Sequence, residues 1–400
     1  MTVGQGADTH LVVVQFAGDI HEAIARRTAG QPETYFAQFY SIAAIEDQVS
    51  VFGRVTSLTV VTDGPHDVVE SSGMRSVGLG LTSGFSEVEV IKALVRLNPT
   101  HIIFRAVMRK AISWAVREQK QVVCVFAESL TNLGFRNRLR NRRLAWALRS
   151  HRVRWVGCYG IGSAETYIAA GVDPAKIVPW DFFHAGLSND FKPKTLAETG
   201  TGKVLYVGAM TPAKGVDDLV AAFAILGKSH PRISLTLVGN DKDDRLKKVI
   251  AALPQTFDCT QVPFVPNHLL EEFMSEFSVV VVPSRHSYPE GLPLVLTHAM
   301  AAKVPVVASD HPMLVRVLTH RQNAMIFPEA QPQALADCLA ELLGNADLYR
   351  TLSASSGTSL KKIVLPVKFH ELCAYGFQDG TRGAAWLRAN AFGTTGRRSH

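Results

Sequence analysis

The stretch that most constrains the fold covers residues 279–310, VVVVPSRHSYPEGLPLVLTHAMAAKVPVVASD. It begins with four valines at 279–282, and such a continuous apolar run is typical of a strand that is buried on both faces of a parallel sheet. A polar turn, an apolar helical segment and a second apolar strand at 305–309 follow. The turn places Glu290 and Gly291 at the amino end of the helix, where N–H groups and the helix dipole favour an anion. The stretch therefore predicts a βαβ unit with a turn that suits a phosphate.

The rest of the chain alternates strand and helix patterns in two series. Such alternation predicts an α/β fold with open, mainly parallel sheets covered by helices on both faces, although it does not give the strand order. In the first series, strands are predicted at 11–17, 57–62, 74–80, 101–105, 122–127 and 153–158, and helices at 34–47, 86–97, 108–118, 136–150 and 163–170. In the second, strands are predicted at 204–207, 233–238, 261–265, 279–282, 305–309 and 324–327, and helices at 216–226, 244–253, 269–277 and 331–343.

A polar segment at 188–203, which contains Pro193, Gly200 and Gly202, separates the two series. The chain has 400 residues, of which 47% are hydrophobic, and this is enough for two α/β domains. We therefore expect one domain over 1–190, a linker at 191–203, a second domain over 204–375 and a flexible tail at 376–400.

The net charge of +7 has a local origin at residues 136–155. This segment holds eight arginines and no acidic residue, so the remainder of the chain is close to neutral. Phe135, Leu139 and Trp146 share one face of the predicted helix. The segment is either a solvated helix surface or a surface that docks on anionic lipid, and we favour docking. Nucleic acid is a weaker alternative, because no RNA-binding signature accompanies the arginines.

Several features argue for a cytoplasmic protein. No apolar run approaches the roughly 20 residues that span a bilayer, and the first ten residues lack the features of a signal peptide. The five cysteines are scattered without metal-type pairs, which favours reduced thiols. If the arginine-rich segment docks on lipid, the protein associates peripherally with the inner face of the membrane.

The segments YVGAMTPAKGVDDLVAAFAIL, LTLVGN and the opening stretch resemble the donor-binding half of retaining glycosyltransferases of family 4 (glycosyl transferases group 1). The resemblance covers about residues 204–343; in the first half it rests mainly on GVDPAKIVPWD. It implies a GT-B fold, in which two Rossmann-like domains with parallel sheets face a cleft. It also implies transfer of a sugar from a UDP- or GDP-linked donor to a saccharide or lipid-linked saccharide acceptor, in polysaccharide or other glycan biosynthesis. No metal or other cofactor is expected.

The resemblance also implies roles for individual residues. Glu290 takes the place of the first glutamate of the family's glutamate-x7-glutamate pair and would hold hydroxyls of the transferred sugar. Gly291 and Leu292 would present N–H groups to the diphosphate. Lys214 would neutralise the leaving group, on which negative charge develops. The predicted donor-binding set is Gly208, Lys214, Gly239, Glu290, Gly291, Leu292 and His298, of which Glu290 and Lys214 are predicted to be catalytic.

Three positions depart from the family pattern: His298 replaces the second glutamate, Ala209 an arginine and Lys303 a glycine. In the family, the second glutamate accepts two hydrogen bonds from ribose hydroxyls, whereas a neutral imidazole accepts one. If the lost hydrogen bond is not replaced, donor binding is weakened by on the order of 1–3 kcal/mol. Two other functions therefore stay open. One is a non-catalytic GT-B protein that binds a nucleotide-sugar, and the other is a GT-B sugar-nucleotide epimerase.

Asp19 and Glu128 follow predicted strands of the first half, at the sheet edge where ligands of open α/β sheets bind. Our hypothesis is that they face the acceptor or the reacting sugar. Each candidate residue also has a purely structural interpretation. Asp19, Glu128 and Glu290 can be helix caps or turn acids, Lys214 a solvated lysine, and His298 a core histidine.

Overall fold

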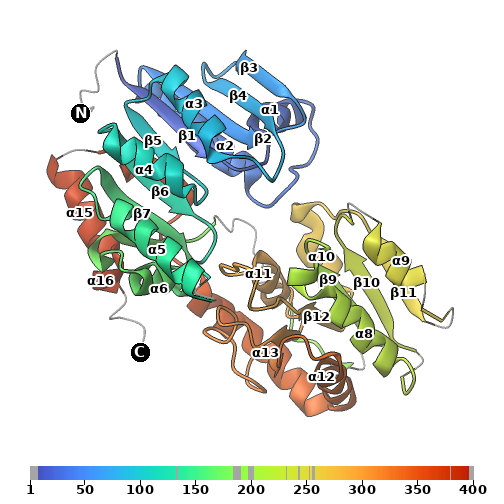
Figure 1. Cartoon of the computed structure of the whole chain (residues 1–400). Coiled ribbons are helices and arrows are strands. Elements are labelled where there is room, and N and C mark those ends of the chain that lie inside the picture. The colour runs from blue at the N-terminus through green and yellow to red at the C-terminus, as the bar shows by residue number, and fades with distance from the viewer. Residues whose placement is uncertain are drawn as a thin grey trace. The chain divides into compact units, whose positions relative to one another are not determined.

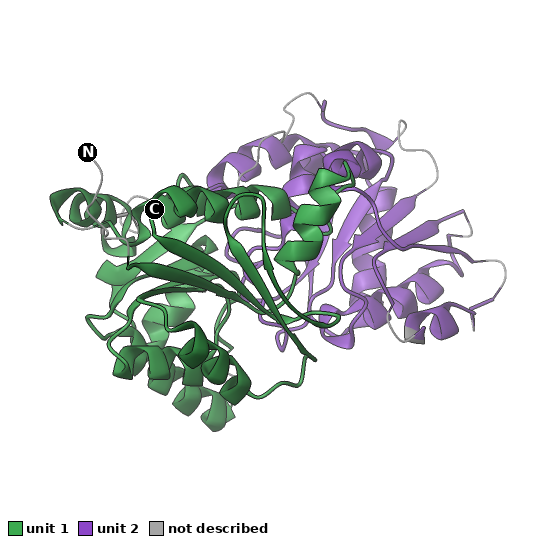
Figure 2. Ribbon diagram, turned by 90° about the horizontal axis from the view of Figure 1, so that it is seen from above, with its two compact units in different colours: residues 1–183, 365–400 green, residues 184–364 purple. Residues whose placement is uncertain are grey.

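The computed structural model describes residues 8–131, 134–182, 191–196, 202–230, 232–241, 244–251, 253–254, 257–378 and 380–395. The chain divides into two compact units (Figure 2). Unit 1 comprises residues 1–183 and 365–400, and unit 2 comprises residues 184–364. Among the described residues, no helix is long and apolar enough to cross a membrane.

Unit 1 is built on an eight-stranded sheet with the order β3-β4-β2-β1-β5-β6-β7-β8 (Figure 1). All neighbouring strands pair in parallel except β3, which runs antiparallel to β4. All six residues of β1 are buried, as expected of a strand with helices on both faces. The strands are β1 (His10–Gln15), β2 (Arg54–Val61), β3 (Pro65–Val69), β4 (Arg75–Leu81), β5 (His101–Phe104), β6 (Gln121–Phe126), β7 (Val153–Tyr159) and β8 (Ile177–Trp180).

Several helices of unit 1 bury apolar residues against this sheet. In α3, for example, Ser86 caps the first turn by accepting a hydrogen bond from the N–H of Val88, and Val90 and Leu94 are buried. The helices are α1 (Ile20–Thr28), α2 (Gln38–Glu46), α3 (Glu87–Leu97), α4 (Arg109–Arg117), α5 (Gly134–Leu148), α6 (Gly160–Ala170), α14 (Phe369–Gly376), α15 (Gly380–Asn390) and α16 (Phe392–Thr395), with 3-10 turns η1 (Asp47–Ser50) and η2 (Pro174–Lys176).

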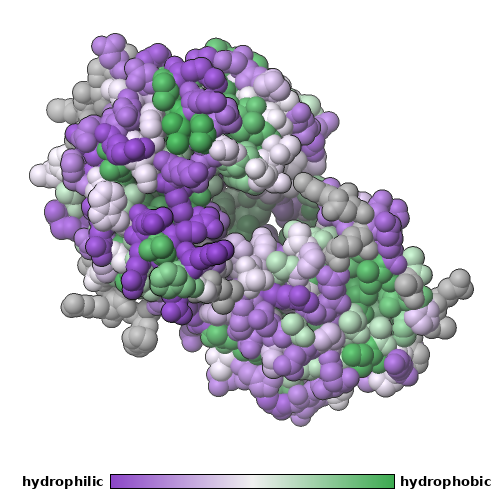
Figure 3. All heavy atoms as spheres, viewed as in Figure 1, coloured by the Kyte–Doolittle hydropathy of each residue, from purple (hydrophilic) through white to green (hydrophobic). Residues whose placement is uncertain are grey.

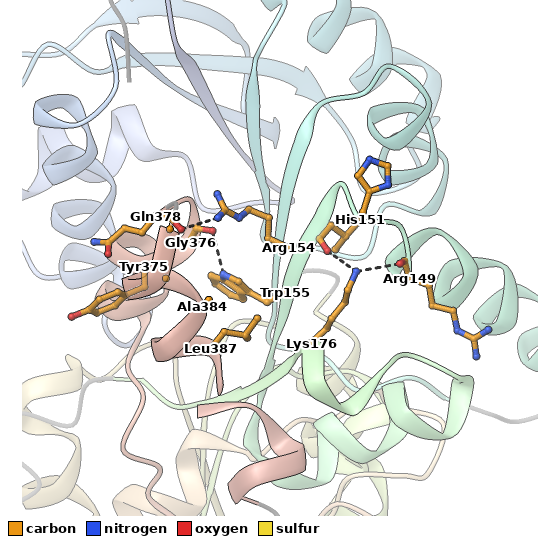
Figure 4. A pocket seen from close by; sticks show the side chains of 13 residues that line it. Arg149, His151, Arg154, Trp155, Lys176, Tyr375, Gly376, Gln378, Ala384 and Leu387 are labelled. Carbon is orange, nitrogen blue, oxygen red and sulfur yellow. Dashed lines mark hydrogen bonds between the residues drawn. The ribbon is translucent and has the colours of Figure 1, made fainter. Parts of the chain in front are cut away.

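The end of the chain differs from the expectation of a second domain that runs to residue 375, followed by a flexible tail. The chain returns to unit 1 at Leu365, and its segment up to residue 395 forms α14, α15 and α16. Phe369 of α14 is fully buried, and the indole N–H of Trp155 in β7 donates to the carbonyl of Gly376 at 3.2 Å (Figure 4). The composition of the tail, which is rich in Gly, Thr and Arg, gave no local signal for helices. The contacts of this segment are made with the rest of unit 1, which the local sequence does not show.

Unit 2 is built on a six-stranded parallel sheet with the order β11-β10-β9-β12-β13-β14. Numbered within the unit, this order is 3-2-1-4-5-6, which is that of a Rossmann fold. The strand order reverses between β9 and β12, and in open α/β sheets ligands bind at this point, outside the carboxyl ends of the strands. The strands are β9 (Lys203–Val207), β10 (Ser234–Val238), β11 (Asp258–Val262), β12 (Val279–Val282), β13 (Val306–Ser309) and β14 (Met325–Phe327).

Helix α13 of unit 2 was not predicted because serines occupy several of its buried positions. The hydroxyl of Ser353 donates to the carbonyl of Lys303 at 2.7 Å. A Cβ on Gly357 would lie 2.5 Å from Nζ of Lys303, so this glycine makes room for the lysine side chain. The helices are α8 (Val216–Leu226), α9 (Arg245–Ala251), α10 (Leu270–Ser275), α11 (Leu294–Ala301), α12 (Pro332–Gly344) and α13 (Ala346–Ile363), with 3-10 turns η3 (Pro212–Lys214) and η4 (Asn267–Leu269).

Candidate functional site

Two loops meet at the point where the strand order of unit 2 reverses. One joins β9 to α8 and the other joins β12 to α11. Gly215 adopts a left-handed conformation with φ of 70°, and a Cβ there would lie 1.9 Å from the backbone oxygen of Pro283. The N–H of Arg285 donates to the carbonyl of Ala213 at 2.9 Å. The two loops are therefore in backbone contact, which brings together side chains that are far apart in the sequence.

The centre of this arrangement is an ion pair between the two residues predicted to be catalytic. Nζ of Lys214 lies 2.5 Å from Oε1 of Glu290, and the side chains are only 17% and 6% exposed. The hydroxyl of Ser284 donates to the same Oε1 at 2.6 Å. The ammonium also lies 4.1 Å from the ring centroid of Tyr288, within the range of a cation–π interaction. The structure thus brings Lys214 and Glu290 together and adds Ser284 and Tyr288, which the sequence analysis missed.

Hydrogen-bonding groups beside this pair are available to a ligand. Within the part of the chain that the structure describes, the hydrogen bonds to Glu290 fall on Oε1, and none falls on Oε2. In the same part of the chain, the N–H groups of Gly291 and Leu292 donate to no backbone carbonyl. These groups precede α11, whose N-cap residue Pro293 makes no side-chain cap. A cation, a carboxylate oxygen and amide donors therefore converge near one helix N-terminus, which suits a ligand with both phosphate and hydroxyl groups.

Gly208 and Gly239 allow the ends of β9 and β10 to approach closely. A Cβ on Gly239 would lie 2.1 Å from the carbonyl oxygen of Gly208, and the N–H of Gly208 donates to the carbonyl of Val238. The hydroxyl of Tyr206 donates to the carbonyl of Ala209, the residue that follows Gly208, at 2.7 Å. Burial, assisted by the charge of Glu290, raises the pKa of Tyr206 far above its ordinary value, so its hydroxyl keeps the proton that this bond needs.

His298 is buried, but it is not surrounded by apolar residues alone. Its side chain is 2% exposed, and its Nδ1 lies 3.1 Å from Oε1 of Glu271 in α10. A carboxylate accepts hydrogen bonds, so a neutral His298 ring carries its proton on Nδ1 and its lone pair on Nε2. Sequence analysis missed Glu271, because nothing in its local pattern distinguishes it from a solvated helix acid.

Part of the chain resembles known glycosyltransferases in sequence. Residues 188–356 match the family model of glycosyl transferases group 1. The chain is 30% identical over 159 residues to the amylovoran biosynthesis glycosyltransferase AmsK of Erwinia amylovora. The aligned region covers 38% of this chain and 39% of AmsK. The chain spans less than half the length of the curated relatives that it matches.

Several solved structures match over nearly the whole chain. Sucrose-phosphate synthase from Thermosynechococcus elongatus aligns with a TM-score of 0.64 and 19% identity, over 92% of this chain and 96% of that one. Anabaena HepE in complex with UDP-glucose aligns with a TM-score of 0.62 and 14% identity, over 92% and 98%. The chain has the GT-B fold. The predicted fold class is therefore confirmed, with Lys214, Glu290 and His298 all in the second of its Rossmann-like units.

The two acidic candidates of the first GT-B unit make structural hydrogen bonds. Asp19 caps α1 by accepting from the N–H of His21 at 3.0 Å, and it lies 3.4 Å from Nε2 of His66. Glu128 accepts from the N–H of Val107 at 3.1 Å, and burial raises the pKa of its carboxyl. The structure thus gives both residues the cap and turn roles named as alternatives, and their contact with an acceptor stays a hypothesis.

In unit 2, a second ion pair fixes the loop that carries Glu290. Arg285 donates two hydrogen bonds to Asp218 of α8, at 2.9 and 2.7 Å, and such a bidentate pair holds both partners in one orientation. Sequence analysis did not single out this pair, whose members lie 67 positions apart. Among the described residues, no group of three or more His, Cys, Asp or Glu side chains could hold a metal ion. The expectation that no metal is needed stays a prediction.

Proposed function

We propose that the chain is a retaining glycosyltransferase of family 4, which transfers a sugar from a UDP- or GDP-linked donor to a saccharide or lipid-linked saccharide acceptor. The observation that carries this proposal is the buried Lys214–Glu290 pair, which lies beside the N-terminus of α11 where the strand order of unit 2 reverses. The match of residues 188–356 to glycosyl transferases group 1 supports it.

In this proposal, each part of the site acts on one part of the donor. The N–H groups of Gly291 and Leu292 bind diphosphate oxygens, and Oε2 of Glu290 accepts hydrogen bonds from sugar hydroxyls. As the bond between the anomeric carbon and the diphosphate oxygen breaks, charge develops on the diphosphate and Lys214 stabilises it. The acceptor oxygen bonds to the anomeric carbon on the same face, and its proton goes to the departing diphosphate. Retention of configuration follows from this same-face attack.

The substrates are proposed from chemistry and from relatives. HepE was solved with UDP-glucose, which supports a nucleotide-sugar donor. The name of AmsK refers to amylovoran biosynthesis, which supports a saccharide acceptor in polysaccharide assembly. His298, whose ring is oriented by Glu271, is proposed to contact the ribose of the donor. Its Nε2 would accept one hydrogen bond there, where a glutamate would accept two.

A donor screen followed by a turnover assay tests the proposal. UDP- and GDP-sugars are expected to raise the melting temperature of the protein, and one of them to be consumed with release of UDP or GDP only when a saccharide acceptor is present. Glu290→Ala is the control, since it should abolish release. Binding without release would favour the non-catalytic alternative, and release of nucleotide without an acceptor would favour the epimerase.

We also propose that α5 docks on the inner face of an anionic membrane, where lipid-linked acceptors are found. Three large apolar side chains of α5 are exposed: Phe135 (80%), Leu139 (41%) and Trp146 (75%). Arginines lie between them, and Figure 3 shows a mostly hydrophilic surface over α5 with apolar spheres among it. Charge complementarity to anionic headgroups and insertion of aromatic rings at the interface favour a membrane as the partner.

Neutralising the arginines of α5 is expected to abolish vesicle binding. Each basic residue near an anionic surface contributes about 1 kcal/mol, so four substitutions to glutamine lower the partition coefficient by about a thousandfold. Co-sedimentation with phosphatidylserine-containing and pure phosphatidylcholine vesicles measures this. Equal binding to the two kinds of vesicle, or unchanged binding of the variant, would contradict docking. The substituted residues are Arg138, Arg140, Arg142 and Arg143, and a control with the same charge loss in unit 2 replaces Lys247, Lys248, Lys361 and Lys362, all exposed.

A further inference from the structure

A histidine in the loop that carries Glu290 lies between two carboxylates. Nε2 of His286 lies 2.9 Å from Oδ1 of Asp310, and its Nδ1 lies 3.2 Å from Oε1 of Glu329. The backbone N–H of His286 donates to Oε2 of the same Glu329. Asp310 follows β13 and Glu329 follows β14, so this histidine joins the loop after β12 to the next two strands of the sheet.

The two carboxylates are both satisfied only by a positively charged ring. Nε2 also lies 3.2 Å from the backbone carbonyl oxygen of Asp310, so a neutral ring carries its one proton on Nε2. The lone pair on Nδ1 then faces the carboxylate of Glu329, which accepts hydrogen bonds and donates none. An imidazolium instead donates from both nitrogens. The contact between His286 and Glu329 is therefore lost when the ring gives up its proton as the pH rises.

Other charged groups surround His286. Arg285, which precedes it, donates twice to Asp218 of α8, so these two charges offset each other. On the same loop, the charge of Glu290 is offset by Lys214, which lies in the loop after β9. Among the described residues, the titratable side chains in contact with the ring itself are Asp310, Glu329 and His311. His286 is thus the cation that the two carboxylates share.

His311 holds the same loop as a neutral ring. The N–H of Met313 donates to Nδ1 of His311 at 3.1 Å, so the ring proton lies on Nε2, which donates to the carbonyl of Tyr288 at 3.0 Å. Burial lowers the pKa of His311, which favours this neutral form. The carbonyl of Tyr288 also accepts from the N–H of Glu290 at 2.8 Å. The two histidines therefore hold the segment that leads to Glu290.

We propose that the protonated ring of His286 positions Glu290 for the donor, with Asp310 and Glu329 as its anchors. This inference rests on the proposed function, since that function assigns a sugar donor to Glu290. His286 is a positioning residue, because it acts on Glu290 through the backbone of the loop. When the ring becomes neutral, the loop loses an anchor, and the carboxylate of Glu290 spends less time in the orientation that the donor needs. Sugar transfer therefore falls as His286 loses its proton.

Two substitutions of His286 test this inference through the pH dependence of kcat/KM. His286→Gln donates a hydrogen bond but carries no charge, whereas His286→Lys keeps a charge over the range in which histidines titrate. We expect the glutamine variant to be about tenfold below the wild type at about pH 6 and within about twofold of it at about pH 9. The lysine variant should lie closer to the wild type at the lower pH and exceed it at the higher. The side chain is 33% exposed, so its replacement should not unfold the protein.

His320→Gln is the matched control in the same unit. His320 is an exposed histidine that precedes β14, at the opposite end of this strand from Glu329, and its Nδ1 accepts from the N–H of Ile326 at 2.9 Å. The ratio of its kcat/KM to that of the wild type should be the same at both pH values. Other groups of the site titrate in every variant, so the ratio to the wild type isolates the contribution of His286.

Hydrogen exchange gives a readout that does not depend on sugar transfer. The N–H of Tyr288 donates to the carbonyl of Arg285 at 2.9 Å, and that of Glu290 donates to Tyr288. In His286→Gln at about pH 6, these two amides should lose about tenfold in protection, whereas the amides of β12 should keep theirs. If the proposed function is wrong, the wild type will transfer no sugar, but this difference in protection will still be seen.

Three results would overturn the positioning role of His286. A purely structural role would lower the activity of His286→Gln equally at every pH, so a constant ratio to the wild type contradicts the inference. The same holds if His286→Lys is as inactive as His286→Gln at about pH 6, because charge would then not matter. Unchanged protection of the amides of Tyr288 and Glu290 would show that His286 does not hold the loop.

Discussion

Replacing Lys214 by alanine is expected to lower kcat/KM for sugar transfer by about 10²–10³-fold, with Glu290→Ala at least as severe. Removing one preorganised group that stabilises transition-state charge has an effect of this size. Lys214 is held by Glu290 and by the ring of Tyr288, so its position is set before a diphosphate binds. The acceptor-dependent release of UDP or GDP measures the loss.

Stability separates this catalytic role from a structural one. Each single variant leaves a charge in a site that is largely buried, which should lower the free energy of unfolding by about 3 kcal/mol. The double variant removes both charges, so it should recover much of that free energy while remaining inactive. Urea unfolding of the three variants checks this. Full activity in either single variant would refute the site assignment, and activity restored in the double variant would show that the pair only stabilises the loops.

The elements predicted correctly are those whose burial appears in their own sequence. Each of the four valines of β12 is buried, and β13 is a short strand of the same kind. Two of the missed elements, β3 and α13, depend on partners elsewhere in the chain. Strand β3 alternates exposed and half-buried residues at an edge, and α13 fills buried positions with serine hydroxyls that bond to backbone oxygens. No local pattern distinguishes such residues from a polar loop.

The same distinction applies to the site. Glu290 and Lys214 were predicted because they belong to segments that resemble a known family. The partners of these residues were not predicted, because Ser284 meets Glu290 only when the turn closes and Glu271 meets His298 only when two helices pack. The fold therefore changes the interpretation of His298: it is half of a histidine–carboxylate pair rather than an isolated replacement for a glutamate.

Replacing Gly215 by alanine is expected to damage both stability and catalysis. The left-handed conformation alone disfavours a side chain, and the new Cβ would lie 1.9 Å from the oxygen of Pro283. That oxygen belongs to the backbone, so it cannot rotate away, and the two loops must separate. We expect the free energy of unfolding to fall by about 3 kcal/mol. Lys214 precedes this glycine and Glu290 lies on the other loop, so separation of the loops would displace the two side chains from each other. We therefore expect kcat/KM to fall by about a hundredfold in the protein that remains folded.

Gly344→Ala is the matched control in the same unit. This glycine ends α12, its φ is not in the left-handed region, and a Cβ there would meet no atom within 4 Å. Its substitution should leave activity unchanged and stabilise the helix by about 0.5–1 kcal/mol. Chemical unfolding and nucleotide release on both variants measure the difference. If Gly215→Ala proved as stable and as active as Gly344→Ala, the contact between the two loops would not be what positions Lys214 against Glu290. The site would then have to form when the donor binds, rather than exist before it.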